Sequence, residues 1–377
     1  MLKAYKYAIL HTEEQKQQLA KFFGSCRFVY NLGLETKLQA WATARKHLTC
    51  IDLANQMKEL KDTEAEWLHE CPSQTLQMAL RNLDNAYTHF FKGGGFPKFK
   101  SKHRKQSIQF PQGVKTDFDN SYIFLPKLKN VTCVFHRTFK GEIKTVTVSK
   151  TSTGKYFVSI LVENQKQLPK KKPVKEKTTV GIDMGVKTFA TLSDGTTFDS
   201  PRYLRGNLKR LRVEQRKLSR RLKKGAKEQS KSYLKQKLVV AKLHEHIKNQ
   251  REDFLHKAST TIIRSFDTIC LEDLNIKGMM QNEKLALAIG EVGWHKFKTM
   301  LEYKADWYGK NILYIGRFQP SSKLCSHCGH IFKELSLKDR SWTCQSCGTH
   351  HNRDENAAKN IKLFGLRNKP STVNVSR

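Results

Sequence analysis

The sequence contains no long hydrophobic run. In 377 residues, no apolar stretch approaches the roughly 18–20 residues that a membrane-spanning helix needs. The first residues, Met1-Leu-Lys-Ala-Tyr-Lys-Tyr, also lack the apolar segment and the small-residue cleavage site of a secretory signal. We therefore expect a cytoplasmic protein that has no membrane partner.

Acidic residues are scarce relative to basic ones. The chain has 34 Asp and Glu against 69 Lys and Arg, which gives a formal net charge of +35. The many positive side chains repel one another and destabilise a compact fold unless a polyanion neutralises them. Nucleic acid is the expected partner, because neutralising phosphates releases counterions. A membrane surface is the alternative, and it is disfavoured because the basic segments lack a broad apolar face.

Cysteines that could pair as disulfides are also lacking. Of the nine, five are scattered without a pairing pattern, which is typical of a reducing compartment: Cys26, Cys50, Cys71, Cys133 and Cys270. Hydrophobic residues make up 38% of the chain, enough for packed cores. Its length allows two or three domains.

The other four cysteines form two C-x2-C pairs, Cys325/Cys328 and Cys344/Cys347, with fifteen residues between them. This spacing predicts one structural Zn²⁺ held by four thiolates. A glycine comes directly after each pair, where such a turn favours a positive φ. A redox role would require a thioredoxin-like βαβ context, which is absent. We expect His327 and His350 at the surface rather than as ligands.

Helical spacing of apolar residues dominates the beginning of the chain, and period-two alternation comes after it. A helix is predicted to begin after Thr12, and residues 12–92 read as all-helical up to the run Gly93–Gly95. Residues 107–163 predict a β-rich barrel or sheet with a turn at Thr153-Gly154, completed by an N-terminal strand. Residues 168–177, rich in Lys and Pro, read as a linker.

Two basic segments are candidates for nucleic-acid contact. In the first, phenylalanines that can stack on bases alternate with cations: Phe96, Lys98, Phe99, Lys100, Lys102, Arg104 and Lys105. A solvated loop is the alternative reading. The second is a helical hairpin between Arg202 and Arg251, with eighteen Lys and Arg against three Glu. The candidates near its turn at Lys224-Gly225 are Arg216, Arg220, Arg221, Lys223 and Lys224.

A heptad-like seam is expected to join the two helices of this hairpin. On the first helix it comprises Leu204, Leu208, Leu211, Leu218 and Leu222, and on the second Leu234, Leu238 and Ala241.

Three acids lie at the ends of predicted elements. Asp183 ends a first strand, Glu272 ends a fourth strand, and Asp354 begins a late helix seven residues after Cys347. Each signal is weak alone, because an acid at a strand end is often simply solvated. In a ribonuclease-H-type sheet, however, strands one and four are neighbours and the final helix packs across them. The carboxylates would then converge and hold two Mg²⁺ or Mn²⁺ ions, as in phosphodiester hydrolysis.

Three other polar residues near these acids are weaker candidates. Asp273 is expected to point to the opposite face of its strand or to cap the next segment of the chain, and Asp194 to serve a turn. Asn356 is close enough in sequence to Asp354 to reach a metal-bound water.

Several motifs together resemble the TnpB family, transposon-encoded RNA-guided endonucleases related to type V CRISPR effectors. They are Gly181–Gly195, Leu271–Met280, Leu301–Gly309, Arg317–Lys323 and His351–Asn360, supported in the first half by Cys26–Asn31, Gly95–Ser101 and the 144–162 hairpin. The resemblance implies a multidomain α/β plus β fold, with a RNase H-like (RuvC) nuclease at 173–321 and 351–377 and an inserted zinc ribbon at 322–350. It also implies a split wedge domain at 1–11 and 106–172 and a helical recognition domain at 12–105.

The resemblance further implies a function. It makes Asp183, Glu272 and Asp354 catalytic, and it implies a guide RNA from the transposon end, a double-stranded DNA target with a short adjacent motif, and cutting of both strands. One copy of the chain on one RNA, in a prokaryotic cytoplasm and at the nucleoid when bound to DNA, is expected. Two alternatives are an RNA-guided repressor that does not cleave and a transposase or transposition accessory protein.

Overall fold

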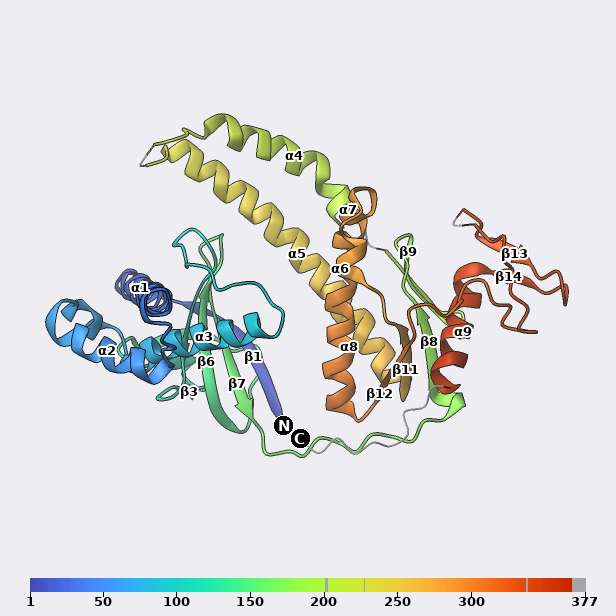
Figure 1. The fold of residues 1–377 in the computed structure, drawn as a ribbon, viewed down its shortest axis with the longest axis horizontal. Coiled ribbons are helices and arrows are strands. Elements are labelled where there is room, and N and C mark those ends of the chain that lie inside the picture. Colours follow the sequence, from blue (N-terminus) through green and yellow to red (C-terminus); the bar gives the residue numbers. More distant parts are fainter. Residues whose placement is uncertain (201–202, 227, 337, 368–377) are drawn as a thin grey trace. The chain divides into compact units, whose positions relative to one another are not determined.

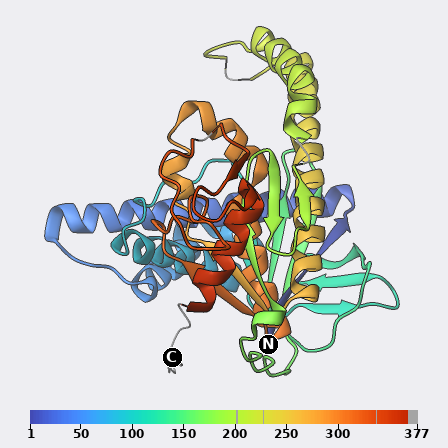
Figure 2. The same cartoon turned by 90° about the vertical axis from the view of Figure 1, so that its right-hand side faces the viewer.

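The computed structural model describes residues 1–200, 203–226, 228–336 and 338–367, which fold as two compact units, Met1–Gln167 and Leu168–Arg377 (Figures 1 and 2). We call them the N-terminal and C-terminal units and describe each by itself. In the part of the chain that the structure describes, no helix is long and apolar enough to cross a membrane.

The N-terminal unit contains a seven-stranded antiparallel sheet in the order β2-β6-β7-β1-β5-β4-β3. The N-terminal strand is part of this sheet, as predicted, and it lies at the sheet's centre. The predicted turn at Gly154, with φ of 85°, joins β6 to β7. The strands are β1 (Leu2–Leu10), β2 (Gln106–Phe110), β3 (Lys115–Asp117), β4 (Tyr122–Leu125), β5 (Lys129–Val134), β6 (Glu142–Lys150) and β7 (Tyr156–Glu163).

Three helices and a short 3₁₀ helix come after β1 in the chain: α1 (Glu13–Ala44), α2 (Cys50–Thr63), the 3₁₀ helix Glu66–Glu70 and α3 (Ser73–Phe91). The predicted start of α1 is confirmed, because the Thr12 hydroxyl accepts from the Gln15 amide and the Gln15 side chain accepts from the Thr12 amide. The all-helical reading of residues 12–92 is confirmed as well.

The C-terminal unit contains a five-stranded sheet in the order β10-β9-β8-β11-β12. Strands β8, β11 and β12 are parallel, β9 runs antiparallel to β8, and β10 runs antiparallel to β9. The first and fourth strands of this unit are thus neighbours, as predicted. The strands are β8 (Thr179–Asp183), β9 (Thr188–Leu192), β10 (Thr197–Asp199), β11 (Thr268–Glu272) and β12 (Asn311–Ile315).

Helices cover both faces of this sheet (Figure 1). On one face, Ile269 and Leu271 of β11 pack in a core with α5 (Lys231–Ser265) and α8 (Trp294–Tyr308). On the other face, Cys270 packs with Ile361 of α9 (Arg353–Arg367). The remaining elements are α4 (Tyr203–Arg221), α6 (Ile276–Met279), α7 (Glu283–Val292) and the paired strands β13 (Ser341–Thr343) and β14 (His350–Asn352).

Helix α9 approaches the sheet closely because β8 carries a glycine. A Cβ at Gly181 would lie 2.1 Å from the Ala358 carbonyl oxygen and 2.5 Å from the Lys362 amide nitrogen, both backbone atoms of α9. We therefore expect Gly181→Ala to lower the free energy of unfolding by about 1–3 kcal/mol, the usual cost of overpacking. Urea unfolding measures it. Gly206→Ala is the control, because nothing lies within 4 Å of a Cβ there. Equal stability of Gly181→Ala and the unsubstituted protein would contradict the prediction.

The hairpin of α4 and α5 turns at Gly225, as predicted, but its predicted seam is wrong on α5. Leu234 and Leu238 are 53% and 37% exposed, whereas Val240, Leu243 and Ile247 pack with Leu211. The buried stripe also contains Gln236, which donates to the Glu214 carboxylate and accepts from Arg221. Because Gln236 is polar, the hydrophobic pattern did not count it among the buried positions. The buried stripe therefore lies on a different side of α5 from the predicted one. On α4, Leu222 is exposed, and the side chain of Leu204 lies outside the described residues.

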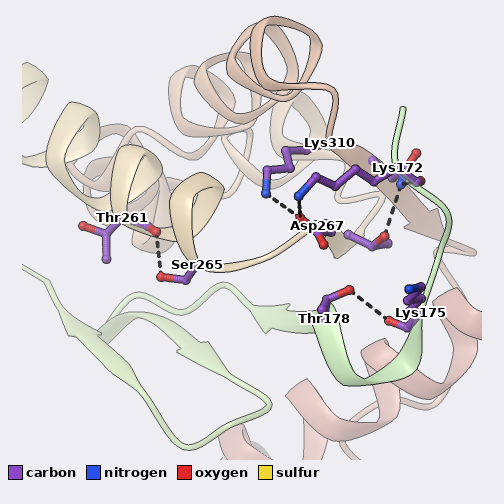
Figure 3. A network of polar contacts seen from close by, with 9 residues as sticks. Lys172, Lys175, Thr178, Thr261, Ser265, Asp267 and Lys310 are labelled. Carbon is purple, nitrogen blue, oxygen red and sulfur yellow. Dashed lines mark hydrogen bonds and ion pairs between the residues drawn. The ribbon is translucent and has the colours of Figure 1, made fainter. Parts of the chain in front are cut away.

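The segment read as a linker is anchored at Lys172, near its middle (Figure 3). Lys172 forms an ion pair with Asp267 at 3.0 Å, and Lys310 binds the same carboxylate at 2.5 Å. The Lys172 amide also donates to the Gly309 carbonyl. These contacts hold the segment to the end of the sheet at which β11 and β12 begin, opposite the end that carries the acids.

Candidate active site and metal centre

The three predicted acids lie on one side of the C-terminal sheet. Side chains alternate along a strand, so Asp183 shares a face with Gly181, and Glu272 shares a face with Cys270. Both Gly181 and Cys270 face α9, whose first turn carries Asp354. Strands β8 and β11 are adjacent, and neighbouring strands are about 4.8 Å apart. The topology therefore directs all three carboxylates to one end of the α9 face.

The carboxylates interact electrostatically. Burial, followed by the charges of Glu272 and Asp354, raises the pKa of Asp183 to about 7, and Arg353 opposes this effect. Like charges brought together in a partly buried site favour either a shared proton or a bound cation. Carboxylate oxygens are the ligands that Mg²⁺ and Mn²⁺ prefer, so the donor set fits such an ion.

Two of the acids have further partners. The Ser321 hydroxyl donates to Glu272 Oε1 at 2.6 Å. Asp354 lies 3.9 Å from the Arg340 guanidinium, and its amide donates to Asn352 Oδ1. Since α9 begins at Arg353, the partial positive charge at its N-terminus also stabilises the Asp354 carboxylate.

Asp273 and Asp194 lie outside this cluster, as predicted. Asp273 forms ion pairs with Lys298 of α8, on the other side of the sheet, and with Arg317. Asp194 accepts a hydrogen bond from the Thr196 amide within its turn.

The prediction for Asn356 is wrong. Its side chain is 1% exposed, and its two ends bind the segment that precedes and opens the first cysteine pair: Oδ1 accepts from the Ser326 amide, and Nδ2 donates to the Leu324 carbonyl. One turn later, Asn360 is fully buried and donates to the carbonyls of Ser321 and Leu324. Sequence reasoning missed this anchor, because spacing does not reveal which loop packs on a helix.

The hydrogen bond from the Ser321 hydroxyl fixes the position of one Glu272 carboxylate oxygen. Ser321→Ala removes the hydrogen bond that orients the carboxylate, and such partners typically change metal affinity or activity by about 10–100-fold. We expect a rise of about tenfold in the Mg²⁺ concentration that half-saturates the three carboxylates. Ser321→Thr retains the hydroxyl and should restore the original curve, and Ser322→Ala serves as the neighbouring control. Superimposable Mg²⁺ titrations for Ser321→Ala and the unsubstituted protein would refute this role.

The four cysteines of the two pairs converge. Among the described residues, they are the only group of three or more His, Cys, Asp or Glu whose ligand atoms all lie within 4.8 Å of one another. The Sγ atoms of Cys325 and Cys347 are 3.7 Å apart, and those of Cys328 and Cys344 are 3.6 Å apart. A tetrahedral zinc with Zn–S bonds of about 2.3 Å places its sulfurs about 3.8 Å apart. The geometry therefore fits Zn²⁺.

The two pairs have the same backbone geometry. The amides of Gly329 and Gly348 donate to the carbonyls of Cys325 and Cys344, both at 2.9 Å. Both glycines have the expected positive φ, 79° and 70°. His327 and His350 lie at the surface: His327 is exposed, and His350 is exposed on β14.

His351 was not singled out from the sequence, yet it lies against the cysteine cluster. It is buried, its Nε2 is 3.0 Å from Cys325 Sγ, and its ring contacts Trp342. The alternation of β14, which exposes His350 and buries His351, was the signal that could have identified it.

The candidate nucleic-acid residues are all exposed, but some have structural partners. Phe96 packs edge-to-face on Tyr87 and Phe90. The Lys100 amine lies 3.8 Å from the centre of the Tyr30 ring. Phe99 lines a shallow groove with residues of α1. The remaining cations of this segment present their side chains to solvent: Lys98, Lys102, Arg104 and Lys105.

In the hairpin, Arg216, Arg220, Lys223 and Lys224 are exposed near the turn. Arg221 instead closes the end of the hairpin, because it donates to the Ser232 carbonyl and to Gln236.

Comparison with known proteins shows relatives along nearly the whole chain. A "Putative RNA-guided DNA endonuclease" of Streptomyces pristinaespiralis is 37% identical over 97% of this chain and 89% of its own length. The "Putative RNA-guided DNA endonuclease InsQ" of Escherichia coli K12 is 35% identical over 97% and 92%. The "TnpB-like protein L770" of Acanthamoeba polyphaga mimivirus is 26% identical over 96% and 73%. The chain belongs to the TnpB family.

Family models agree with this assignment. A "Probable transposase" model matches residues 159–283, and a "Cas12f1-like, TNB domain" model matches residues 294–361, which include the four cysteines and Asp354. A "Helix-turn-helix domain" model matches residues 1–46, where this TnpB family member has β1 and the single continuous helix α1.

A solved structure shares the fold. "Cryo-EM structure of the Cas12f1-sgRNA-target DNA complex" matches with a TM-score of 0.58 and 14% identity, over 96% of this chain and 98% of that one. This TnpB family member therefore shares its mixed α/β fold with Cas12f1.

Proposed function

We propose that the protein is an RNA-guided DNA endonuclease that hydrolyses both strands of its target. The proposal is supported by the electrostatic effect of Glu272 and Asp354 on Asp183, together with the adjacency of β8 and β11 and the packing of α9 against Gly181. The names of the relatives support the class of reaction. The net charge of +35 supports nucleic-acid partners.

The three carboxylates would hold two divalent ions, Mg²⁺ or Mn²⁺. When bound, such ions supply an activated water and stabilise the leaving 3′-oxygen of a phosphodiester. Asp183, whose pKa is raised by burial, would contribute a central ligand. Ser321 would orient Glu272, and the N-terminus of α9 would orient backbone dipoles toward Asp354. Zinc at the four cysteines would be structural, because four thiolates complete its coordination.

The domains would have the boundaries and roles expected for the TnpB family. We assign residues 1–11 and 106–172 to the wedge, 12–105 to recognition, 173–321 and 351–377 to the nuclease and 322–350 to the zinc ribbon. A guide RNA from the transposon end would supply sequence specificity by pairing with one DNA strand. One copy of the chain would act on one RNA and recognise a short motif beside the target.

The direct test is purification with co-expressed guide RNA, followed by incubation with matched and mismatched plasmids and Mg²⁺. Linear product from the matched plasmid alone is expected. Tight guided binding without nicking at any Mg²⁺ or Mn²⁺ concentration would support a repressor instead. Joining of DNA ends without RNA would support a transposase.

The raised pKa of Asp183 predicts a pH-dependent stability. Its folded pKa of about 7 exceeds the unfolded value near 3.9. Its stabilising contribution is therefore fully present below about pH 3.9 and is lost as the pH rises through about 7. With zinc retained but without Mg²⁺ or Mn²⁺, Asp183→Asn should unfold at a higher temperature than the unsubstituted protein at pH 8, and the difference should shrink toward pH 4. Asp194→Asn is the control. Equal midpoints of thermal unfolding for Asp183→Asn and the unsubstituted protein at both pH 8 and pH 4 would contradict the raised pKa of Asp183.

A further inference from the structure

Phe318 is the most exposed large hydrophobic residue of the described chain, at 94% of its possible surface. It lies three residues after β12 and precedes the first cysteine pair. Burying a phenylalanine side chain stabilises a protein, so an almost fully exposed ring forgoes that stabilisation. Single exposed hydrophobic residues are common, however, so exposure alone decides nothing.

The segment that carries Phe318 is held in place from both sides. Before it, the Arg317 guanidinium donates to the Asp273 carbonyl and carboxylate, at 3.3 and 3.5 Å. After it, the Ser321 hydroxyl donates to Glu272, and the Ser321 carbonyl accepts from the buried Asn360. The Gln319 amide donates to the Gly316 carbonyl, which makes the segment a tight turn. Phe318 is therefore exposed on an anchored turn.

The turn lies at the acid end of the sheet. Strands β11 and β12 are parallel, and Glu272 is paired with Ile315. The chain leaves β12 beside Glu272, and Ser321 returns to contact that carboxylate. The ring thus belongs to the short segment that joins the last parallel strand to a residue bonded to a candidate catalytic acid.

We propose that Phe318 stacks on an unpaired base of the DNA strand that enters the acid site. The proposal rests on the proposed nuclease function. Aromatic rings bind unpaired bases irrespective of sequence, which suits an enzyme whose specificity comes from pairing elsewhere. The preceding residue, Arg317, is exposed as well, and its guanidinium is paired with Asp273. A lone exposed ring suits a single base better than it suits an apolar protein surface, which requires a continuous patch.

Stacking can be tested without cleavage. The guided complex is assembled on target DNA with 5-iodouracil at successive positions, irradiated in Ca²⁺, and analysed by mass spectrometry. A cross-link to Phe318 at one or two adjacent positions is expected. Absence of this cross-link at every position would overturn the proposal. A cross-link in a complex that never cleaves in Mg²⁺ would uphold stacking and reject the nuclease function.

Cleavage kinetics provide the second measurement. Phe318→Ala should slow single-turnover cleavage by about tenfold, within the range for the loss of one base–aromatic stack. Phe318→Trp should retain the rate, Phe318→Leu should not, and Tyr308→Ala, an exposed ring at the other end of the sheet, is the control. An abasic site at the cross-linked position should slow the unsubstituted protein but not slow Phe318→Ala further. Full activity of Phe318→Ala, or an undiminished abasic effect in it, would overturn the proposal.

Discussion

Asp183→Asn is expected to reduce guided DNA cleavage by about a thousandfold or more while leaving target binding intact. Asp183 is the acid on which burial and the other two carboxylates act most strongly. An amide of the same shape offers no negative charge to a divalent ion. It also removes a like charge from the cluster, so the fold should be retained.

Plasmid linearisation and guided binding, measured on the same preparation, separate these effects. Asp194→Asn is the matched control, because Asp194 is a turn acid of the same unit and its amide counterpart can still accept from Thr196. Unchanged cleavage by Asp183→Asn would show that this carboxylate takes no part in the reaction. Loss of both binding and cleavage would instead indicate that Asp183 is needed for assembly.

If the four cysteines hold zinc as proposed, its loss should unfold more than the proposed ribbon, residues 322–350. Cys344→Ser, or removal of zinc by a chelator, is expected to lower the midpoint of thermal unfolding by at least about 10 °C and to abolish cleavage. The ribbon's own core consists of Cys325, Leu335, Trp342 and Cys344 with Phe332 beside them. So small a core cannot hold a fold without the metal.

Unfolding of the segment around the cysteines should also disturb the positions of Glu272 and Asp354, because α9 and Ser321 connect the two regions. Asn356 and Asn360 bind the backbone that enters the first cysteine pair, and Ser321 connects the same segment to Glu272. If the ribbon unfolds, these buried amides lose their partners, at a cost of about 1–3 kcal/mol each. The zinc content, the midpoint of thermal unfolding and the rate of cleavage should therefore fall together.

Cys50→Ser, which changes a half-buried thiol of the N-terminal unit, is the control for this experiment. An unchanged midpoint and unchanged cleavage for Cys344→Ser would make the ribbon dispensable.

Local patterns were sufficient for much of the fold. The Thr12 cap, the alternation of β7 and the glycines after each cysteine pair act over a few residues, and the structure has each of them as predicted. The adjacency of β8 and β11 was also predicted, because an acid at the end of each strand suggested a known strand order.

Features that depend on contacts between distant segments were missed. The buried stripe of α5 includes Gln236, which is tolerated there because it is hydrogen-bonded to Glu214 and Arg221 across the hairpin. A hydrophobic pattern counts such a residue as exposed, so the stripe was placed on the wrong side. Asn356 was misjudged for the same reason, since its partners Ser326 and Leu324 lie 30 and 32 residues away in the sequence.

The sequence by itself determined the residue types of the acid cluster and the cysteine cluster and the elements that carry them, because spacing within a strand, a helix or a C-x2-C pair is a local property. Only the tertiary structure decided how these centres are connected. The hydrogen bonds from α9 to the first cysteine pair, and from Ser321 to Glu272, join segments that meet only once the sheet has formed. The exposure of Phe318 was likewise decided by the anchors on either side of it, which no pattern in its own segment records.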